Sequence, residues 1–251
     1  MRTIKISDGA EKNYGVKYVG NTLSGLIKEI GGEMRFSEDG TRAFLKISAP
    51  ERYADYVTGE IEDRIADVIA VGYKYGYFRA GISASGLTPF EREILYSALI
   101  AADIDEDRRY VIKKARLVAE YAVDGIFNFR LAPLKRKWEE IVGYVPSAFT
   151  SGQLADFVRY LIGERRGKKA IIRNGMVYDG NYNLLERSAL LPDLPCGAEG
   201  RILREVILSA SGRVEVGSDI PEADRRYLRD FYGGRISRAG TDARPRQKKE
   251  K

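Results

Sequence analysis

The sequence predicts an α+β fold with a small N-terminal β-α-β-β unit, a central antiparallel helical bundle and a small mixed α/β module at its C-terminal end. Three observations support this prediction. Apolar residues alternate with polar ones over Arg2–Ser7, as in a strand. Helical periodicity dominates the middle of the chain, and strand signals return around Asn174-Gly175. We therefore divide the chain into 1–50, 51–163, 164–236 and a basic tail at 237–251 that we expect to be disordered.

The first fifty residues predict one helix between strands. After the strand Arg2–Ser7, a short helix is expected over residues 21–30 and should end at Gly31-Gly32. Met34–Phe36 and Thr41–Ser48 then read as two strands joined by a turn. This unit is small, so we expect it to pack against the helices that follow.

Three helices are expected between residues 51 and 125. The first follows Pro50 and carries an apolar face that begins with Val57, Ile61 and Ile65. The second covers 89–102, where Thr88 and Glu91 have the spacing of a capping box. The third is expected over Tyr110–Val123, with Gly125 ending it.

Residues 125–162 predict a helical hairpin preceded by an aromatic box. The box is Gly125-Ile-Phe-Asn-Phe-Arg-Leu. Apolar residues at helical spacing follow over Leu134–Val145 and again over Leu154–Ile162, separated by a break at Thr150-Ser151-Gly152. In a structural interpretation, Asn128 caps the next helix, both phenylalanines enter the core and Arg130 pairs with a carboxylate. In a functional one, Arg130 centres an interaction site, because a planar guanidinium suits phosphate or carboxylate.

The same stretch resembles the YtxC-like family of sporulation proteins of endospore-forming Firmicutes. The resemblance rests on the box, on Trp138-Glu-Glu-Ile-Val, and on Asp156-Phe-Val-Arg-Tyr-Leu, and it extends over roughly residues 60–236. It implies a sporulation context and no established catalytic activity. On this basis we expect a protein partner, with the interaction residues Asn128, Phe129, Arg130, Arg159 and Tyr160.

The C-terminal third changes period and predicts a mixed module. Strands are expected at Lys169–Arg173 and Met176–Tyr178 on either side of the Asn174-Gly175 turn, and near Tyr182–Leu185. A helix over 199–210 and a strand at Arg213–Val216 follow. The last expected helix is Pro221–Phe231, capped by Ser218 or Asp219.

The amino-acid composition excludes several types of catalytic and metal site. The chain of 251 residues has no histidine, which removes Ser-His-Asp and Cys-His nucleophiles and histidine metal sites. A lone Cys196 cannot form an internal disulfide, which favours the cytoplasm. No apolar run reaches the length of a membrane span, and the N-terminus lacks a secretory signal. We therefore expect no membrane association and no cofactor, and an enzyme is the less favoured class; the oligomeric state stays open.

The net charge of +6 suggests nucleic acid as an alternative partner. Residues 235–251 hold seven basic and two acidic residues, so +5 of that charge lies at the C-terminal end. A nearly neutral body argues for weak, non-specific contact with phosphates. The contacts expected in this alternative are Arg165, Arg166, Lys168, Lys169, Arg244, Arg246, Lys248 and Lys249.

A third hypothesis is a carboxylate- or metal-dependent enzyme built on Asp103, Asp105 and Asp107. The segment lacks the glycine and distal glutamate of a calcium loop, and acidic residues are favoured at any helix start. A structural role is therefore the preferred interpretation. Protein contacts rank first among the three hypotheses, nucleic-acid binding second and metal chemistry third.

Overall fold

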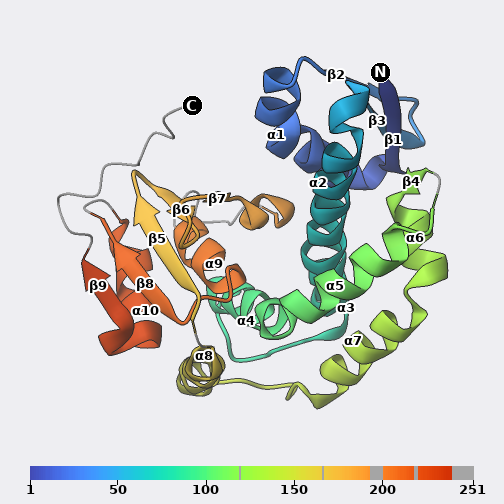
Figure 1. The fold of residues 1–251 in the computed structure, drawn as a ribbon. Coiled ribbons are helices and arrows are strands. Elements are labelled where there is room, and N and C mark those ends of the chain that lie inside the picture. Colours follow the sequence, from blue (N-terminus) through green and yellow to red (C-terminus); the bar gives the residue numbers. More distant parts are fainter. Residues whose placement is uncertain (119, 166, 193–199, 218–219, 239–251) are drawn as a thin grey trace. The chain divides into compact units, whose positions relative to one another are not determined.

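The computed structural model describes residues 1–118, 120–165, 167–192, 200–217 and 220–238. It has the α+β fold, with helices and two small mixed sheets (Figure 1). The contacts divide the chain into two compact units, each made of separate segments. Unit 1 holds Met1–Ser83, Asp103–Ser147 and Ala189–Leu191; unit 2 holds Ala84–Ala102, Ala148–Ser188 and the described residues from Pro192 onward. The helical stretch 51–163 thus contributes to both units.

The sheet of unit 1 has the strand order β2-β3-β1-β4. β1 runs antiparallel to β3 and parallel to β4, and β2 runs antiparallel to β3. Ile4 pairs with Ile47 and Ile6 with Leu45, and all four side chains are buried. This confirms the alternation at the start of the chain. The strands are β1 (Arg2–Gly9), β2 (Glu33–Glu38), β3 (Arg42–Ala49) and β4 (Tyr121–Ala122).

One long helical rod runs through unit 1. α2, the π-helical turn η3 and α3 continue into one another (Figure 1), and Val57, Ile61 and Ile65 on the expected apolar face are completely buried. α1 covers the sheet, while α5 packs on α2. The helices are α1 (Asn13–Glu29), α2 (Ala54–Asp67), η3 (Val68–Tyr73), α3 (Lys74–Gly81), α5 (Ile104–Ala115), α6 (Val123–Arg130) and α7 (Ala132–Tyr144).

Helix α1 begins eight residues earlier than the sequence pattern indicates. It starts at Asn13 without a side-chain cap, so the usual start signal is missing. Gly15 lies inside it because a Cβ there would stand 2.7 Å from Cγ1 of Val68. The glycine permits close approach of α1 to the rod, and tertiary packing outweighs its poor helix propensity.

The expected helix Tyr110–Val123 is wrong at its C-terminal end. α5 stops at Ala115, and Tyr121 instead pairs with Ile6 in the sheet. The Tyr121 hydroxyl also donates to Glu62 at 3.1 Å. Gly125 does not end a helix but lies within α6, so strand pairing outweighs the helical period over this stretch.

The expected hairpin of α7 with α8 (Ser151–Glu164) is also wrong. α7 belongs to unit 1, where it packs on α3 and α6, whereas α8 belongs to unit 2, where it packs on α4 (Pro89–Ala102) and α10 (Glu222–Tyr232). The amphipathic faces themselves are confirmed, since Leu134, Trp138 and Leu154 are buried. Periodicity identifies a buried face but does not identify the surface that covers it.

Unit 2 is built on a sheet of strand order β7-β6-β5-β8-β9. β5, β6 and β8 have the expected bounds, and so does α4, whose Thr88 and Glu91 form the expected capping box. β8 runs parallel to both β5 and β9. The elements not yet given bounds are β5 (Lys169–Arg173), β6 (Met176–Tyr178), β7 (Leu184–Leu185), α9 (Arg201–Leu208), β8 (Arg213–Val216) and β9 (Ile236–Arg238).

The C-terminal end differs from the expectation in one element. β9 extends into the stretch assigned to the tail, because Ser237 pairs with Glu215 and Arg238 with Val216. Ser218 and Asp219, the expected caps of α10, lie outside the described residues, and so do residues 239–251. No helix in the described part of the chain is both long and apolar enough to cross a membrane.

Candidate functional site

The aromatic box lies on α6 and presents three consecutive exposed residues, Asn128, Phe129 and Arg130. We call these three residues the box surface. Phe129 is 86% exposed, so the expectation that both phenylalanines enter the core is wrong for this one. Asn128 does not cap the next helix either, because the N-cap of α7 is Leu131. Three of the five interaction residues expected from the sequence are thus displayed together.

The N-terminal turn of α6 is fixed to the sheet by a two-point ion pair. The guanidinium of Arg42 on β3 donates to both carboxylate oxygens of Asp124, at 2.9 and 2.7 Å. These hydrogen bonds hold the pKa of Asp124 below its usual value, although burial opposes them. Acidic residues also favour a helix N-terminus. The ion pair therefore sets the position of α6 on unit 1.

Phe127 anchors the other side of α6. Its ring centroid lies 4.7 Å from that of Tyr73 and 5.9 Å from that of Trp138, which is completely buried. Since successive helical residues point in different directions, an inward Phe127 leaves Phe129 facing solvent. The box therefore combines one anchoring ring with one displayed ring.

Basic side chains lie within the box and directly after it in the sequence. Lys135 lies 5.2 Å over the Phe127 ring and donates to the carbonyl oxygen of Asn128 at 3.2 Å. Arg130 and Arg136 are exposed, and neither forms an ion pair with a described residue. The expected pairing of Arg130 with a carboxylate within the chain is not found among the described residues. The box surface therefore combines the exposed ring of Phe129 with an adjacent arginine that has no ion-pair partner among the described residues.

Arg159 and Tyr160 do not share this face. They lie on α8 in unit 2, whereas the box surface belongs to unit 1. The Nε of Arg159 donates to the carbonyl oxygen of Asp230 at 2.8 Å, and its Nη1 pairs with Asp156. Tyr160 is 65% exposed. Arg159 thus joins α8 to α10, and Tyr160 remains a separate exposed position.

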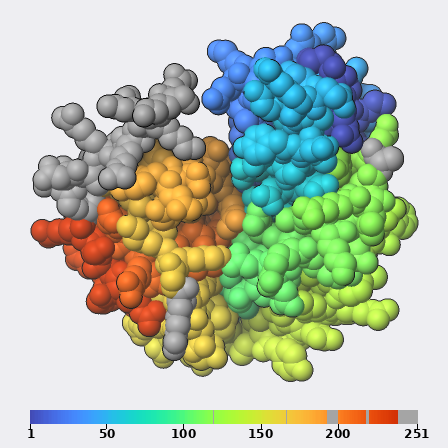
Figure 2. All heavy atoms as spheres, viewed as in Figure 1, coloured from blue at the N-terminus to red at the C-terminus, as the bar shows by residue number. Residues whose placement is uncertain are grey.

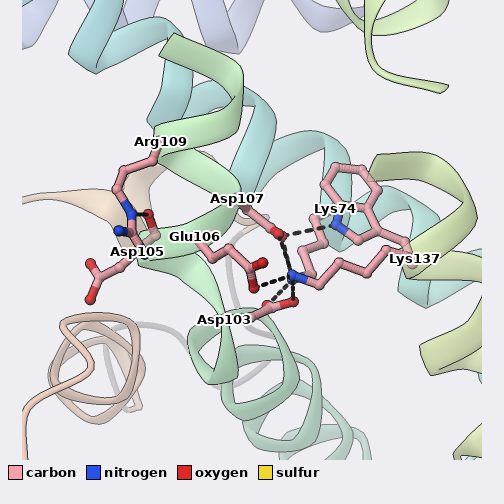
Figure 3. Close-up of polar contacts among 8 residues, drawn as sticks. Lys74, Asp103, Asp105, Glu106, Asp107, Arg109 and Lys137 are labelled. Atoms are coloured by element: carbon pink, nitrogen blue, oxygen red, sulfur yellow. Dashed lines mark hydrogen bonds and ion pairs between the residues drawn. The ribbon is translucent and has the colours of Figure 1, made fainter. Parts of the chain in front are cut away.

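Asp103 and Asp107, at the start of α5, form a charge cluster with two lysines that the sequence analysis did not single out (Figure 3). Lys74, on α3, is completely buried and contacts both Asp103 and Asp107. Nζ of Lys137, on α7, lies within 3.0 Å of Asp103, Glu106 and Asp107. We call these five residues the lysine–aspartate cluster.

The cluster joins three helices rather than offering open carboxylates. Indole Nε1 of Trp138 also donates to Asp107, at 2.9 Å. Both carboxylate oxygens of Asp107 therefore have partners. Burial opposes the charged form of Lys137, yet its carboxylate partners hold its pKa above the usual value. The two ammonium groups supply the positive charge that compensates these carboxylates. Figure 3 shows Asp105 directed away from the cluster, so the three aspartates do not converge.

A second buried carboxylate lies under the start of α1. Asp8 is completely buried, and its Oδ1 accepts from the Tyr73 hydroxyl at 2.6 Å and from the backbone of Gly9. Burial raises the pKa of Asp8 to about 6, despite these two hydrogen bonds. The sequence offers no signal for this pair, because the two residues are far apart in the chain.

The basic residues of the nucleic-acid alternative have different surroundings. Arg165 and Lys169 line a cavity in unit 2, together with Arg213 and Arg235, which sequence reasoning missed. Lys168 is exposed and does not line this cavity. Arg166, Arg244, Arg246, Lys248 and Lys249 lie outside the described residues.

Comparison with known proteins adds no relative to this description. We find no match to the chain among protein-family models, curated proteins or solved structures. The resemblance to the YtxC-like family stays an expectation from the sequence.

Proposed function

We propose that this protein is a non-catalytic cytoplasmic binding protein that acts in endospore formation by holding a partner protein on the box surface, Asn128, Phe129 and Arg130. The single observation that carries this proposal is the 86% exposure of Phe129 on a helix held by the Arg42–Asp124 ion pair and by the ring of Phe127. A rigid aromatic residue loses little conformational freedom on binding.

The energetics favour a contact at this position. Burying about 150 Å² of a phenyl side chain contributes about 3–4 kcal/mol at 25 cal/mol per Å². Aromatic and arginine residues are the side chains that most often dominate protein interfaces. Phe129 and Arg130 present this combination on adjacent positions of one helix.

The same surface indicates the chemistry of the partner. An apolar pocket would receive Phe129, and a carboxylate on its rim would pair with the exposed Arg130. Asn128 adds a side-chain donor and acceptor at the edge. We therefore infer an acidic partner with an aromatic-accepting pocket.

The biological setting comes from the sequence. The resemblance to the YtxC-like family supports sporulation, and the lone cysteine supports a reducing cytoplasm. Asp103 and Asp107 are already ion-paired with Lys74 and Lys137, which argues against metal chemistry at these carboxylates. Together these observations favour binding over catalysis.

A pull-down from sporulating cells with matched variants tests the proposal. Phe129→Ala and Arg130→Ala are compared with wild type and with Leu117→Ala, which truncates another exposed apolar residue of unit 1. The proposal expects one partner protein to be captured by wild type and by Leu117→Ala, and lost with Phe129→Ala. Equal capture by all four proteins would contradict it.

A further inference from the structure

Unit 2 contains a cavity of about 840 Å³ where several chain segments converge. It lies at the end of α8 and at the first residues of the parallel strands β5, β8 and β9. Figure 2 shows the yellow atoms of this part of the chain, which includes α8 and β5, beside the orange to red atoms of the segments that follow in unit 2. The lining residues are Gly163, Arg165, Gly167, Lys169, Gly212, Arg213, Glu215, Gly234, Arg235, Ile236 and Ser237.

The lining is strongly cationic. It contains four basic side chains and a single carboxylate, that of Glu215. Glu215 pairs with Lys169 at 2.7 Å. Arg213 and Arg235 are exposed and form no ion pair with any described residue. Positive charge that is not compensated locally raises the local concentration of anions.

Backbone groups hold two of the arginines in place. Nη1 of Arg235 donates to the carbonyl oxygen of Ile162 at 2.7 Å, and Nη1 of Arg165 donates to that of Ile207 at 3.3 Å. A carbonyl oxygen fixes the guanidinium without removing its charge. The remaining N–H groups of Arg235 therefore keep a planar, oriented set of donors for a ligand.

Two glycines in the lining matter for its shape. Gly212 approaches the carbonyl of Arg165 so closely that a Cβ would stand 2.2 Å from its oxygen. At Gly234 a Cβ would have no atom within 4 Å, so this position borders open space. The hydroxyl of Ser237 adds another donor type to the lining.

The volume and the lining residues of the cavity indicate which class of ligand fits it. The volume falls within the range of about 300–1,000 Å³ that is usual for small-molecule sites. No lining residue is aromatic, so the cavity offers no platform on which nucleic-acid bases could stack. Arginine and lysine are the side chains that bind phosphoryl groups.

We propose that this cavity binds a small anion that carries several phosphoryl groups. The inference goes beyond the protein contact proposed for unit 1, because it involves different residues and a different unit. Arg213 and Arg235 would contact the phosphoryl oxygens, and Gly234 would leave room for them.

Calorimetric titration of the full-length protein with inorganic tripolyphosphate tests this proposal. The variants are Arg213→Glu, Gly234→Val and, as a matched control, Arg229→Glu, which makes the same charge change at an exposed position of α10 outside the cavity. Thermal unfolding of each variant first establishes that it is folded. The expected result is binding by wild type and Arg229→Glu, with at least tenfold weaker binding by Arg213→Glu and Gly234→Val.

Three results would overturn the proposal. The first is no heat of binding at millimolar tripolyphosphate, and the second is equal weakening by Arg229→Glu and Arg213→Glu. The third is tight binding of a single-stranded oligonucleotide that tripolyphosphate does not displace, which would assign the surface to nucleic acid. None of these results bears on capture of a protein by the box surface, so the two proposals can fail separately.

Discussion

At the scale of single residues, we expect the largest changes in the free energy of unfolding from substitutions of charges buried in unit 1. Lys74 and Asp107 are both completely buried and face each other within the lysine–aspartate cluster. The desolvation of such a pair is offset only while both partners are present. The residues of the box surface are exposed and are not desolvated on folding, so we expect them to contribute little to the free energy of unfolding.

Replacing Lys74 by methionine should destabilise the protein by about 3–5 kcal/mol, because Asp107 loses a buried counter-charge. Urea unfolding at pH 7 measures the loss. Lys28→Met, at an exposed lysine of α1, is the control and should change stability by less than about 0.5 kcal/mol. Adding Asp107→Asn to Lys74→Met should cost less than the sum of the two single changes, since the two residues interact. Strict additivity would show that the contact is energetically unimportant.

Asp8→Asn should stabilise the protein at neutral pH by about 2–3 kcal/mol. The folded-state pKa of Asp8 is about 6 and its ordinary value is 3.8, so the folded state takes up the proton first as the pH falls. The ionised carboxyl therefore destabilises the fold fully above pH 6, and this penalty disappears below about pH 4. Urea unfolding of both proteins at pH 4 and pH 7.5 should show a difference only at the higher pH. A pH-independent difference would contradict the assignment.

Arg130→Ala should leave the free energy of unfolding within about 0.5 kcal/mol of wild type, because the side chain is exposed and makes no ion pair with a described residue. Arg42→Ala provides the contrast, since it removes the two-point contact with Asp124. Chemical denaturation of both variants makes the comparison. A loss of several kcal/mol in Arg130→Ala would show a buried paired charge and remove Arg130 from the proposed interface.

At the scale of elements, local chemistry at the helix starts decides where several elements begin. Thr88 and Glu91 at α4, and Thr150 and Gln153 at α8, each satisfy two backbone N–H groups reciprocally. These sequence signals act over three residues, so α4 was predicted with its correct bounds. α1 has no such cap, and its start was missed.

Thr88→Ala should destabilise the protein by about 1 kcal/mol, because the hydroxyl that accepts from the Glu91 backbone is lost. Thr58→Ala is the matched control. Thr58 lies inside α2 and donates to the carbonyl oxygen of Ala54, and alanine is the better helix former there. Thermal unfolding should therefore show a clear loss for Thr88→Ala and little or no loss for Thr58→Ala. The same loss in both variants would argue against the cap.

At the scale of the whole molecule, the sequence predicts what local contacts determine and misses what distant segments assemble. The strands around Asn174-Gly175 were predicted at their correct bounds because a two-residue turn fixes them. Arg213 and Arg235 join Arg165 at one cavity only through the parallel pairing of β5, β8 and β9, which no local pattern encodes. The burial of Lys74 is equally hidden from local patterns. Its sequence neighbours are tyrosines, and the groups that surround its ammonium come from α5 and α7.

The functional predictions divide in the same way. The Phe-Asn-Phe-Arg box was singled out from the sequence, but its direction on α6 follows from the contacts of Phe127 with Tyr73 and Trp138. With Phe127 turned inward, Phe129 is the aromatic side chain of the box that is exposed to solvent.

Photo-cross-linking from position 129 tests this central claim most directly. A photoreactive amino acid replaces Phe129 in one protein and Leu117 in another, and both are irradiated in sporulating cells. The account predicts a discrete adduct with one acidic protein from position 129 and none of it from position 117. The same adducts from both positions, or none from position 129, would contradict the account and leave the box as a structural part of unit 1.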